Sequence, residues 1–185
     1  ATFRTVDVVG LDTLVHVANG IYDNCPDDER HDLFKLPDFI QTMVDNKWLG
    51  SKTGQGFYKK VKGDKGKSEI LTLDLETMEY RQKKSAKFAT LELTKSIDKV
   101  IERFPVLVGG KDKAAAFYRK SFGQLFAYVS HRIPEITDQL YKIDDAMKAG
   151  FGWEHGPFQI WDAVGLETGL EFIKAEGQEA AAWVA

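Results

Sequence analysis

Four histidines are the side chains of this sequence best suited to acid–base or metal chemistry. They are His16, His31, His131 and His155. A metal pair on one helix face needs two histidines three or four residues apart, and no two of these are so spaced. We therefore expect all four to be solvated or to lie at the edge of a core, rather than to act as ligands or bases.

Acidic side chains offer two further candidates. The stretch 23–30 reads DNCPDDER, but its carboxylates are crowded together and no distant ligand completes a metal shell, so a solvated loop is favoured. The pair Asp144 and Asp145 is better explained as charge near the start of a helix than as an acid–base couple. No serine lies in a nucleophile-elbow pattern, so serine hydrolysis has no support.

A glycine-rich stretch is the first candidate for phosphate binding. Residues 50–60 read GSKTGQGFYKK, with three glycines in seven residues. No helix pattern follows them, and their spacing fits neither the P-loop nor the dinucleotide fingerprint. The favoured interpretation is a helix end followed by a chain reversal into an extended segment.

A lysine cluster is the second candidate. It lies on an expected β-hairpin and comprises Lys59, Lys60, Lys62, Lys65 and Lys67. Lysine binds phosphate as a point charge, but exposed lysines also discourage the pairing of a strand edge, and this second role is favoured. If the hairpin has a ligand, we expect a phosphate of CoA.

Composition places the chain among ordinary globular proteins. Its 185 residues are 43% hydrophobic and 29% charged, and its net charge of −3 gives no electrostatic case for nucleic acid. No apolar run approaches the roughly 20 residues of a membrane helix, and no signal peptide is visible. Cys25 is the only cysteine. An internal disulfide is therefore excluded, and a reducing, cytoplasmic setting is expected.

The sequence contains an internal repeat. FRTVDVVGLDT at 3–13 aligns without a gap with FQIWDAVGLET at 158–168, and Asp7 and Gly10 match Asp162 and Gly165. We expect two copies of one supersecondary unit. The second copy has a long helical lead-in, whereas the first has two residues before Phe3. We therefore expect the chain to be a fragment that starts inside a unit.

Hydrophobic periodicity predicts a mainly helical fold with a small antiparallel sheet. Helices are expected at 4–22 (or as a short and a longer helix, because a fresh start can follow Gly10), 36–47, 88–104, 112–132, 143–148, 157–164 and 167–174. Strands are expected at 57–62, 69–74 and 79–82. Pro105 with Gly109 and Gly110 should end helix 88–104, and Pro134 should break or kink the next, with 134–141 continuing it. The inward face of helix 112–132 is expected to carry Phe117, Tyr118, Phe122, Leu125, Phe126 and Val129.

Two stretches resemble the C-terminal domain of the NAD-dependent 3-hydroxyacyl-CoA dehydrogenases. That family has a GPF-x-x-x-D-x-x-G-L-D segment followed by G-x-K-T-G-x-G-F-Y. Here FRTVDVVGLDT at 3–13 and WLGSKTGQGFYKK at 48–60 stand in the same order. The second copy resembles the first of these segments again, with Gly156-Pro157-Phe158 leading into Asp162 and Gly165.

The resemblance implies a mainly α fold, a duplicated helical domain of the 6-phosphogluconate-dehydrogenase C-terminal-like type. It implies an N-terminally truncated first unit at 1–60, a β-hairpin or three-strand connector at 61–86 and a second unit at 87–185. The activity it implies is oxidation of 3-hydroxyacyl-CoA to 3-oxoacyl-CoA, with hydride passing to NAD, in fatty-acid β-oxidation. In that family NAD, a His–Glu pair and a serine belong to an N-terminal Rossmann domain, and an Asn-Arg pair opens the helical domain. None of these motifs occurs here, so we carry over no catalytic, cofactor-binding or metal-binding residue.

The part that the resemblance assigns to this chain is structural. It would supply the helical substrate-closing and dimerisation part of the enzyme and be inactive alone, with acyl-CoA bound in the full-length protein and an enoyl-CoA hydratase domain potentially fused beyond Ala185. The second copy would substitute for a dimer partner, through segment 117–128, and uncovered Val6, Val9 and Val17 would favour self-association. Two alternatives stay open: a non-catalytic helical binding or oligomerisation module, and a dehydrogenase of another β-hydroxyacid.

Overall fold

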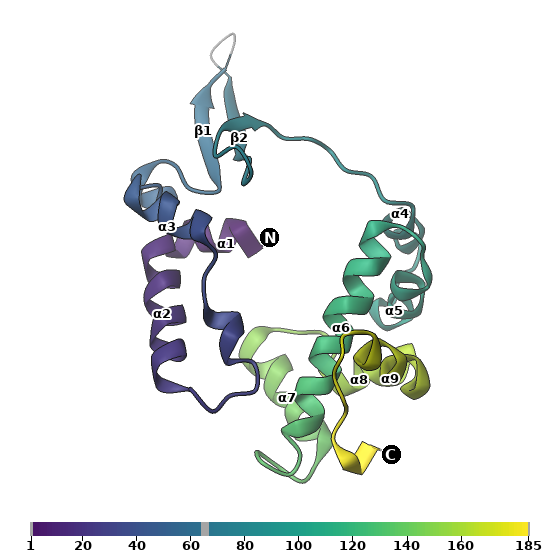
Figure 1. Ribbon diagram of the computed structural model, residues 1–185. Coiled ribbons are helices and arrows are strands. Elements are labelled where there is room, and N and C mark those ends of the chain that lie inside the picture. Colours follow the sequence, from purple (N-terminus) through teal and green to yellow (C-terminus); the bar gives the residue numbers. More distant parts are fainter. Residues whose placement is uncertain (1, 64–66, 185) are drawn as a thin grey trace. The chain divides into compact units, whose positions relative to one another are not determined.

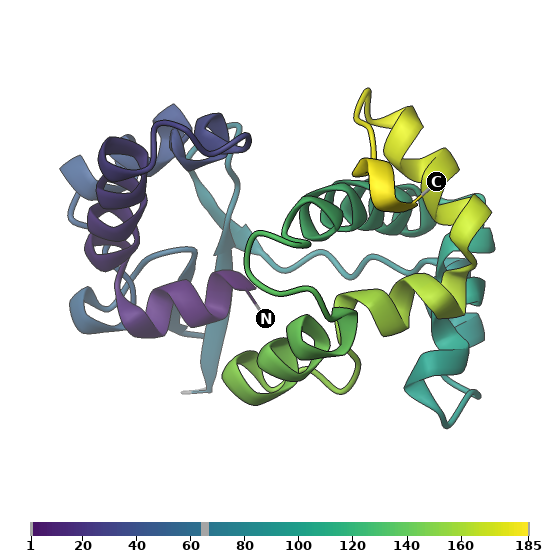
Figure 2. The same ribbon diagram turned by 90° about the horizontal axis from the view of Figure 1, so that it is seen from below.

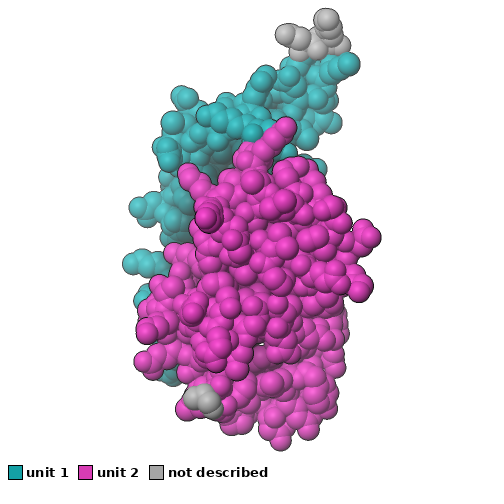
Figure 3. Space-filling model, turned by 90° about the vertical axis from the view of Figure 1, so that its right-hand side faces the viewer, with its two compact units in different colours: residues 1–85 teal, residues 86–185 magenta. Residues whose placement is uncertain are grey.

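A computed structural model describes residues 2–63 and 67–184. The chain forms two compact units, residues 1–85 and 86–185, which are coloured separately in Figure 3. The described part is mainly helical, and its three strands form one antiparallel sheet, as the sequence predicts. The finer division into 1–60, 61–86 and 87–185 stays a prediction.

The first unit joins helices to the sheet (Figure 1). Its elements are α1 (Thr2–Val9), α2 (Leu11–Asn24), η1 (His31–Phe34), α3 (Asp38–Asp45), η2 (Ser51–Thr53), β1 (Tyr58–Lys62), β2 (Ser68–Leu73) and β3 (Tyr80–Gln82). The strands lie in the order β1-β2-β3, with Tyr58 opposite Thr72 and Leu73 opposite Tyr80. The three predicted strands are thus confirmed. The turn predicted between the first two includes residues 64–66, which lie outside the described residues.

The sheet contributes to the core of the first unit. Phe57, just before β1, and Leu73, at the end of β2, are buried together with Leu11 of α2 and Met43 of α3. Alternation along a strand directs every second side chain to one face, so one face of this short sheet can close over the helices.

The second unit is helical. Its elements are α4 (Ala89–Thr94), α5 (Val100–Gly109), α6 (Lys113–His131), α7 (Leu140–Phe151), α8 (Pro157–Val164), α9 (Leu166–Ala175) and η4 (Ala182–Val184). Asp112 caps α6, because its Oδ1 accepts a hydrogen bond of 3.0 Å from the N–H of Ala115. The predicted helices at 112–132, 157–164 and 167–174 are confirmed within a few residues.

The repeat in sequence is also a repeat in structure. In the first unit α1 meets α2 at a sharp bend at Gly10, seen in Figure 1 and Figure 2, and in the second unit α8 meets α9 at Gly165. Gly10 has φ 110° and ψ 131°, and Gly165 has φ 98° and ψ 136°. Residues that carry a side chain rarely adopt a backbone φ in this positive range, so glycine is needed at both bends. The prediction of one helix at 4–22 is therefore wrong, and its alternative, a short helix followed by a longer one, is confirmed.

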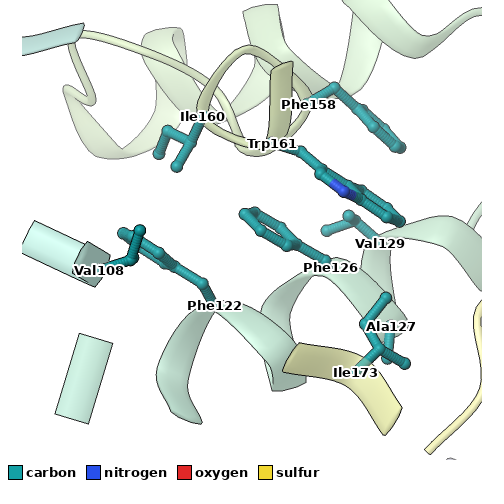
Figure 4. Close-up of a cluster of buried hydrophobic side chains, with 9 residues drawn as sticks. All are labelled: Val108, Phe122, Phe126, Ala127, Val129, Phe158, Ile160, Trp161 and Ile173. Carbon is teal, nitrogen blue, oxygen red and sulfur yellow. The ribbon is translucent and has the colours of Figure 1, made fainter. Parts of the chain in front are cut away.

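An aromatic core holds the second unit together (Figure 4). Phe126 of α6 is fully buried, and the Trp161 ring of α8 lies parallel to it. A side chain at Gly169 of α9 would collide with the Trp161 indole, so the glycine leaves the space that this ring fills. α6 thus supplies the centre of the core, with α8 and α9 packed against it.

The prediction of one helix at 88–104 is wrong. Helix α4 ends at Thr94, α5 begins at Val100, and Pro105 lies inside α5 instead of ending it. The side chain of Arg103 explains how the break is stabilised: its Nε donates a hydrogen bond of 2.7 Å to the carbonyl of Ile97, which the break leaves without a helical partner. The predicted stop at Gly109 and Gly110 is confirmed.

Three further expectations need correction. Residues 134–141 do not continue α6, because turns at 132–136 and irregular backbone at 137–139 separate it from α7, which begins at Leu140. The break near Pro134 itself is confirmed. Asp144 is the fifth residue of α7, not a residue near its start. Phe117 is 65% exposed, so it does not belong to the inward face of α6.

Candidate functional site

The polar centre of the first unit is the carboxylate of Asp7, on α1. Its Oδ1 accepts the backbone N–H of Phe57 and its Oδ2 that of Tyr58, each at 2.8 Å. Asp7 is only 4% exposed. A buried carboxylate needs such donors to offset the loss of hydration. One side chain therefore fixes the point at which the glycine-rich stretch enters β1.

The backbone N–H groups of Gly50 and Gly56 in this stretch already donate hydrogen bonds within the protein. The N–H of Gly50 donates to Gln55 O at 2.8 Å, and that of Gly56 donates to Tyr58 O at 3.0 Å. A side chain at Gly50 would collide with the Asp7 backbone, and one at Gly56 would collide with its carboxylate. Phosphate binding needs free N–H groups and no facing anion. The geometry thus supports the interpretation of a helix end and chain reversal and does not fit a dinucleotide phosphate.

Other polar side chains of the same stretch also have partners inside the first unit. Lys52 Nζ lies 2.6 Å from Asp12 Oδ1, and this hydrogen bond lowers the pKa of Asp12. The Leu49 N–H donates to Thr53 Oγ1 at 3.0 Å. The motif K-T-G-x-G-F-Y is therefore accounted for by structural contacts.

Tyr80 closes the loop from the sheet side. Its hydroxyl donates a hydrogen bond of 2.6 Å to the carbonyl of Gly56. Burial raises the pKa of Tyr80 to about 12, with a smaller effect of the negative charge of Asp7. Lys59 of the predicted lysine cluster lies over the Tyr80 ring, with Nζ 5.2 Å from its centroid. Lys65 of that cluster lies outside the described residues.

The second unit has a comparable arrangement around Asp144. This carboxylate is buried, and it accepts the N–H groups of Phe158 at 2.8 Å and Gln159 at 3.1 Å, at the start of α8. Burial raises the pKa of Asp144, against the smaller lowering effect of these hydrogen bonds. A side chain at Gly156 would collide with Asp144. The interpretation of Asp144 as charge at the start of its own helix is therefore wrong: it caps α8.

The four histidines have different surroundings. His16 is exposed on α2. The others contact neighbours of ordinary kinds: the Tyr22 ring, stacked at 4.0 Å from the His31 ring; the Glu179 carbonyl, 3.1 Å from His131 Nε2; and the Phe104 ring, edge-on to His155 at 6.2 Å. Within residues 2–63 and 67–184, no group of three or more His, Cys, Asp or Glu side chains could hold a metal ion.

Exposed apolar side chains follow the α1–α2 pair. Val8, Val9 and Val17 are at least half exposed, whereas Val6 is partly buried against the core of its unit. Exposed apolar patches of this kind are common at surfaces that bind another protein surface. None of the helices in the described residues is long and apolar enough to cross a bilayer.

Sequence reasoning missed the role of both buried carboxylates. Asp7 binds residues 50 and 51 positions away in the chain, and no local pattern reports such a contact. For Asp7 the repeat was the available signal, because both copies carry an aspartate at this position; Asp144 lies outside the aligned segments.

Comparison with known proteins identifies the domain. A family model described as 3-hydroxyacyl-CoA dehydrogenase, C-terminal domain, matches residues 1–60 and again residues 122–183. A probable 3-hydroxyacyl-CoA dehydrogenase of Bacillus subtilis is 40% identical over 184 residues, which cover 100% of this chain and 23% of the relative. No solved structure matches the chain significantly.

Two further relatives carry names from fatty-acid oxidation. A fatty acid oxidation complex subunit alpha of Psychrobacter arcticus is 37% identical over 89% of this chain and 20% of its own length. A putative fatty acid oxidation complex trifunctional enzyme of Rickettsia felis is 24% identical over 85% of this chain and 20% of its own length. The chain thus spans less than a quarter of these relatives. Together with the two matched segments, the comparisons show that the chain belongs to the 3-hydroxyacyl-CoA dehydrogenase C-terminal domain family, in a duplicated form.

Proposed function

We propose that this chain is the helical substrate-closing and assembly part of an NAD-dependent 3-hydroxyacyl-CoA dehydrogenase and does not oxidise substrate alone. The observation that carries the proposal is that the family model matches two segments of the chain. A relative named a probable 3-hydroxyacyl-CoA dehydrogenase supports it, and the chain covers 23% of that relative's length. The reaction proposed for the whole protein is oxidation of 3-hydroxyacyl-CoA to 3-oxoacyl-CoA in the cytoplasm. NAD, acyl-CoA and the catalytic base would be supplied or bound largely by parts outside this chain.

The polar groups of the first unit favour a structural role over catalysis. Asp7, Lys52 and Tyr80 have their hydrogen-bonding atoms directed at neighbours in the same unit. A catalytic acid or base must instead reach the reacting group of a bound substrate. The glycine-rich loop, which faces the Asp7 carboxylate, does not fit the phosphates of NAD.

Assembly is the second half of the proposal. The exposed Val9 and Val17 offer an apolar face on the α1–α2 pair, and the two family segments could serve as pseudo-equivalent halves of a dimer-like pair. Within segment 117–128, all of which the structure describes, Phe117 is the exposed aromatic residue, whereas Phe122 and Phe126 belong to the core. Phe117 is therefore the side chain of this segment that we propose for a contact surface. A fused enoyl-CoA hydratase domain also stays a proposal.

The test is NADH-dependent reduction of acetoacetyl-CoA by the chain alone and by the full-length product of the same gene, at equal molar concentrations. An inactive chain beside an active full-length protein supports the proposal. Turnover by the chain alone would place the chemistry in its own residues, with His16 and His155 the first to replace. If neither protein is active, the assignment of this reaction is wrong.

A non-catalytic helical binding or oligomerisation module is the second candidate. The exposed valines of α1 and α2 favour it, because a module that works by contact needs such a face. Replacing Val9 and Val17 by Thr should lower self-association, followed by analytical ultracentrifugation, under both candidates. Dehydrogenase activity of the full-length protein distinguishes the two candidates, because the non-catalytic module predicts none. A dehydrogenase of another β-hydroxyacid would be recognised by activity with that acid but not with acetoacetyl-CoA.

A further inference from the structure

Two matching positions of the repeat differ sharply in exposure. Asp7 and Leu11 are 4% and 0% exposed in the first copy. Their counterparts Asp162 and Leu166 are both exposed in the second copy, Leu166 to 50%. Both copies have an eight-residue helix that meets a second helix at a glycine bend of the same conformation, so we look for the difference in what covers them.

In the first copy the cover is the segment 49–58. Leu49 accepts the N–H of Leu11 through its carbonyl at 3.1 Å, and Phe57 and Tyr58 donate their N–H groups to Asp7. The second copy keeps the same groups without these partners. Among the described residues, Asp162 makes no hydrogen bond or ion pair, and its charge acts on the nearby Asp144.

The position after Leu11 and Leu166 carries an acidic residue in both copies, Asp12 and Glu167. Lys52 of the covering segment lies 2.6 Å from Asp12 in the first copy. The residue that matches Asp12 in the second copy is Glu167, which is exposed and has no ion pair within the part of the chain that the structure describes. Within the described ranges, the second copy thus has an unpaired carboxylate, that of Glu167, at the position where Asp12 of the first copy pairs with the ammonium group of Lys52.

A hollow of about 370 Å³ lies beside Asp162 and Leu166 in the second unit. Its lining includes Leu140, Tyr141, Asp144, Phe158, Asp162 and Leu166. Apolar walls with a few converging polar groups are the usual make-up of a ligand site. The two carboxylates in this lining oppose an anionic ligand. The oxygens of Asp144 already accept N–H groups of α8, so the exposed Asp162 is the carboxylate that can accept N–H donors of a ligand.

The buried aspartates show which ligand suits such a carboxylate. Asp7 binds two successive N–H groups that follow Gly56, and Asp144 binds two successive N–H groups shortly after Gly156. In both cases a side chain in place of the glycine would collide with the aspartate. The recurring ligand is an extended or helix-starting backbone in which glycine permits the close approach.

We propose that the α8–α9 face of the second unit, formed by Asp162, Leu166 and Glu167, binds an extended polypeptide segment of another protein or domain. The segment carries glycine before two free backbone N–H groups and a lysine toward its N-terminal side, the chemistry of residues 49–60 of this chain. Asp162 accepts the two N–H groups, Glu167 pairs with the lysine, and the Leu166 N–H donates to a carbonyl of the segment. The site is independent of dehydrogenase activity.

The probe is a fluorescein-labelled peptide with the sequence of residues 49–60, LGSKTGQGFYKK, titrated with the whole chain and followed by fluorescence anisotropy. Saturable binding is expected for the unchanged chain. Asp162→Ala should weaken it at least about tenfold, because a charged acceptor of two hydrogen bonds is lost. Asp145→Ala, which removes an exposed carboxylate of the same unit, should leave the affinity unchanged.

Two further arms identify the contacts. A peptide carrying Gly56→Ala should not bind, because its methyl group would collide with the carboxylate. Glu167→Lys in the chain should weaken binding, and a peptide carrying Lys52→Glu should restore it. Circular dichroism verifies that each variant of the chain is folded. The proposal is overturned if the unchanged chain shows no saturable binding at millimolar concentration, or if Asp162→Ala binds as tightly as the unchanged chain.

Discussion

The rings of Phe126 and Trp161 lie 4.8 Å apart between centroids, with their planes only 5° from parallel. Phe126 is on α6 and Trp161 on α8, so this stack joins two helices of the second unit. Phe122 stacks on the other side of Phe126 at 5.6 Å. Close packing of this kind leaves little room for relaxation after a change in side-chain volume.

The first prediction follows from this stack. Phe126→Ala should lower the free energy of unfolding of the second unit by about 3–5 kcal/mol, because it removes a fully buried ring and leaves a cavity. Phe117→Ala, on the same helix but at an exposed position, should change it by no more than about 0.5 kcal/mol. Urea unfolding followed by tryptophan fluorescence measures both. Similar losses in the two variants would contradict the assignment of Phe117 to the surface.

The second prediction compares matching aspartates. Asp7→Ala leaves the N–H groups of Phe57 and Tyr58 without an acceptor in a largely buried place, at a cost of about 3 kcal/mol. Asp162→Ala removes an exposed carboxylate at the equivalent position and should cost less than about 0.5 kcal/mol in the chain alone. Hydrogen exchange of the two amides locates the effect: their protection should fall in the first variant and persist in the second.

The third prediction compares two glycines of the first unit. Gly56→Ala should be strongly destabilising, because the new methyl group would collide with the Asp7 carboxylate. Gly20→Ala, inside α2 with open space around it, should stabilise by about 0.5–1 kcal/mol through the better helix propensity of alanine. The thermal midpoints should therefore shift in opposite directions. A tolerated Gly56→Ala would mean that the loop does not press against Asp7.

Local patterns were sufficient for most of the elements. Short strand-like runs between turn residues located three strands, and a fresh helix start after Gly10 was recognised as an alternative within 4–22. The repeat predicted that α8 and α9 would resemble α1 and α2, and both bends have the same backbone conformation at Gly10 and Gly165. These features depend on residues close together in the chain, which a sequence displays directly.

Features set by distant contacts could not be predicted in this way. The break between α4 and α5 depends on Arg103, which binds the carbonyl of Ile97, although the apolar spacing across the break continues as in a single helix. The roles of Asp7 and Asp144 depend on backbone N–H groups brought together by folding. Nothing in the types of these residues distinguishes a buried cap from a solvated acid, so the candidate binding face had to await the structure.

The fourth prediction concerns Asp112, whose carboxylate joins two helix starts. Its Oδ2 accepts the N–H of Thr90 at 2.9 Å in α4, and its Oδ1 accepts that of Ala115 in α6. These hydrogen bonds, first that of Thr90, lower the pKa of Asp112. A carboxyl whose folded pKa is lowered stabilises the folded state above its unfolded pKa of about 3.9, and this contribution is lost as the pH falls through the folded pKa.

Replacing Asp112 by Asn should therefore cost most stability near neutral pH and less in acid. Asp144→Asn provides the contrast, because burial raises the pKa of Asp144. A raised folded pKa gives a contribution that is complete below the unfolded pKa and is lost as the pH rises through the folded pKa. The cost of Asp144→Asn should thus be larger in acid than at neutral pH. Urea midpoints of both variants and the unchanged chain are measured between about pH 3 and 7. The loss of stability should change with pH in opposite directions in the two variants. Changes in the same direction would refute one of the two assignments, and a loss that does not depend on pH for Asp112→Asn would refute its capping role.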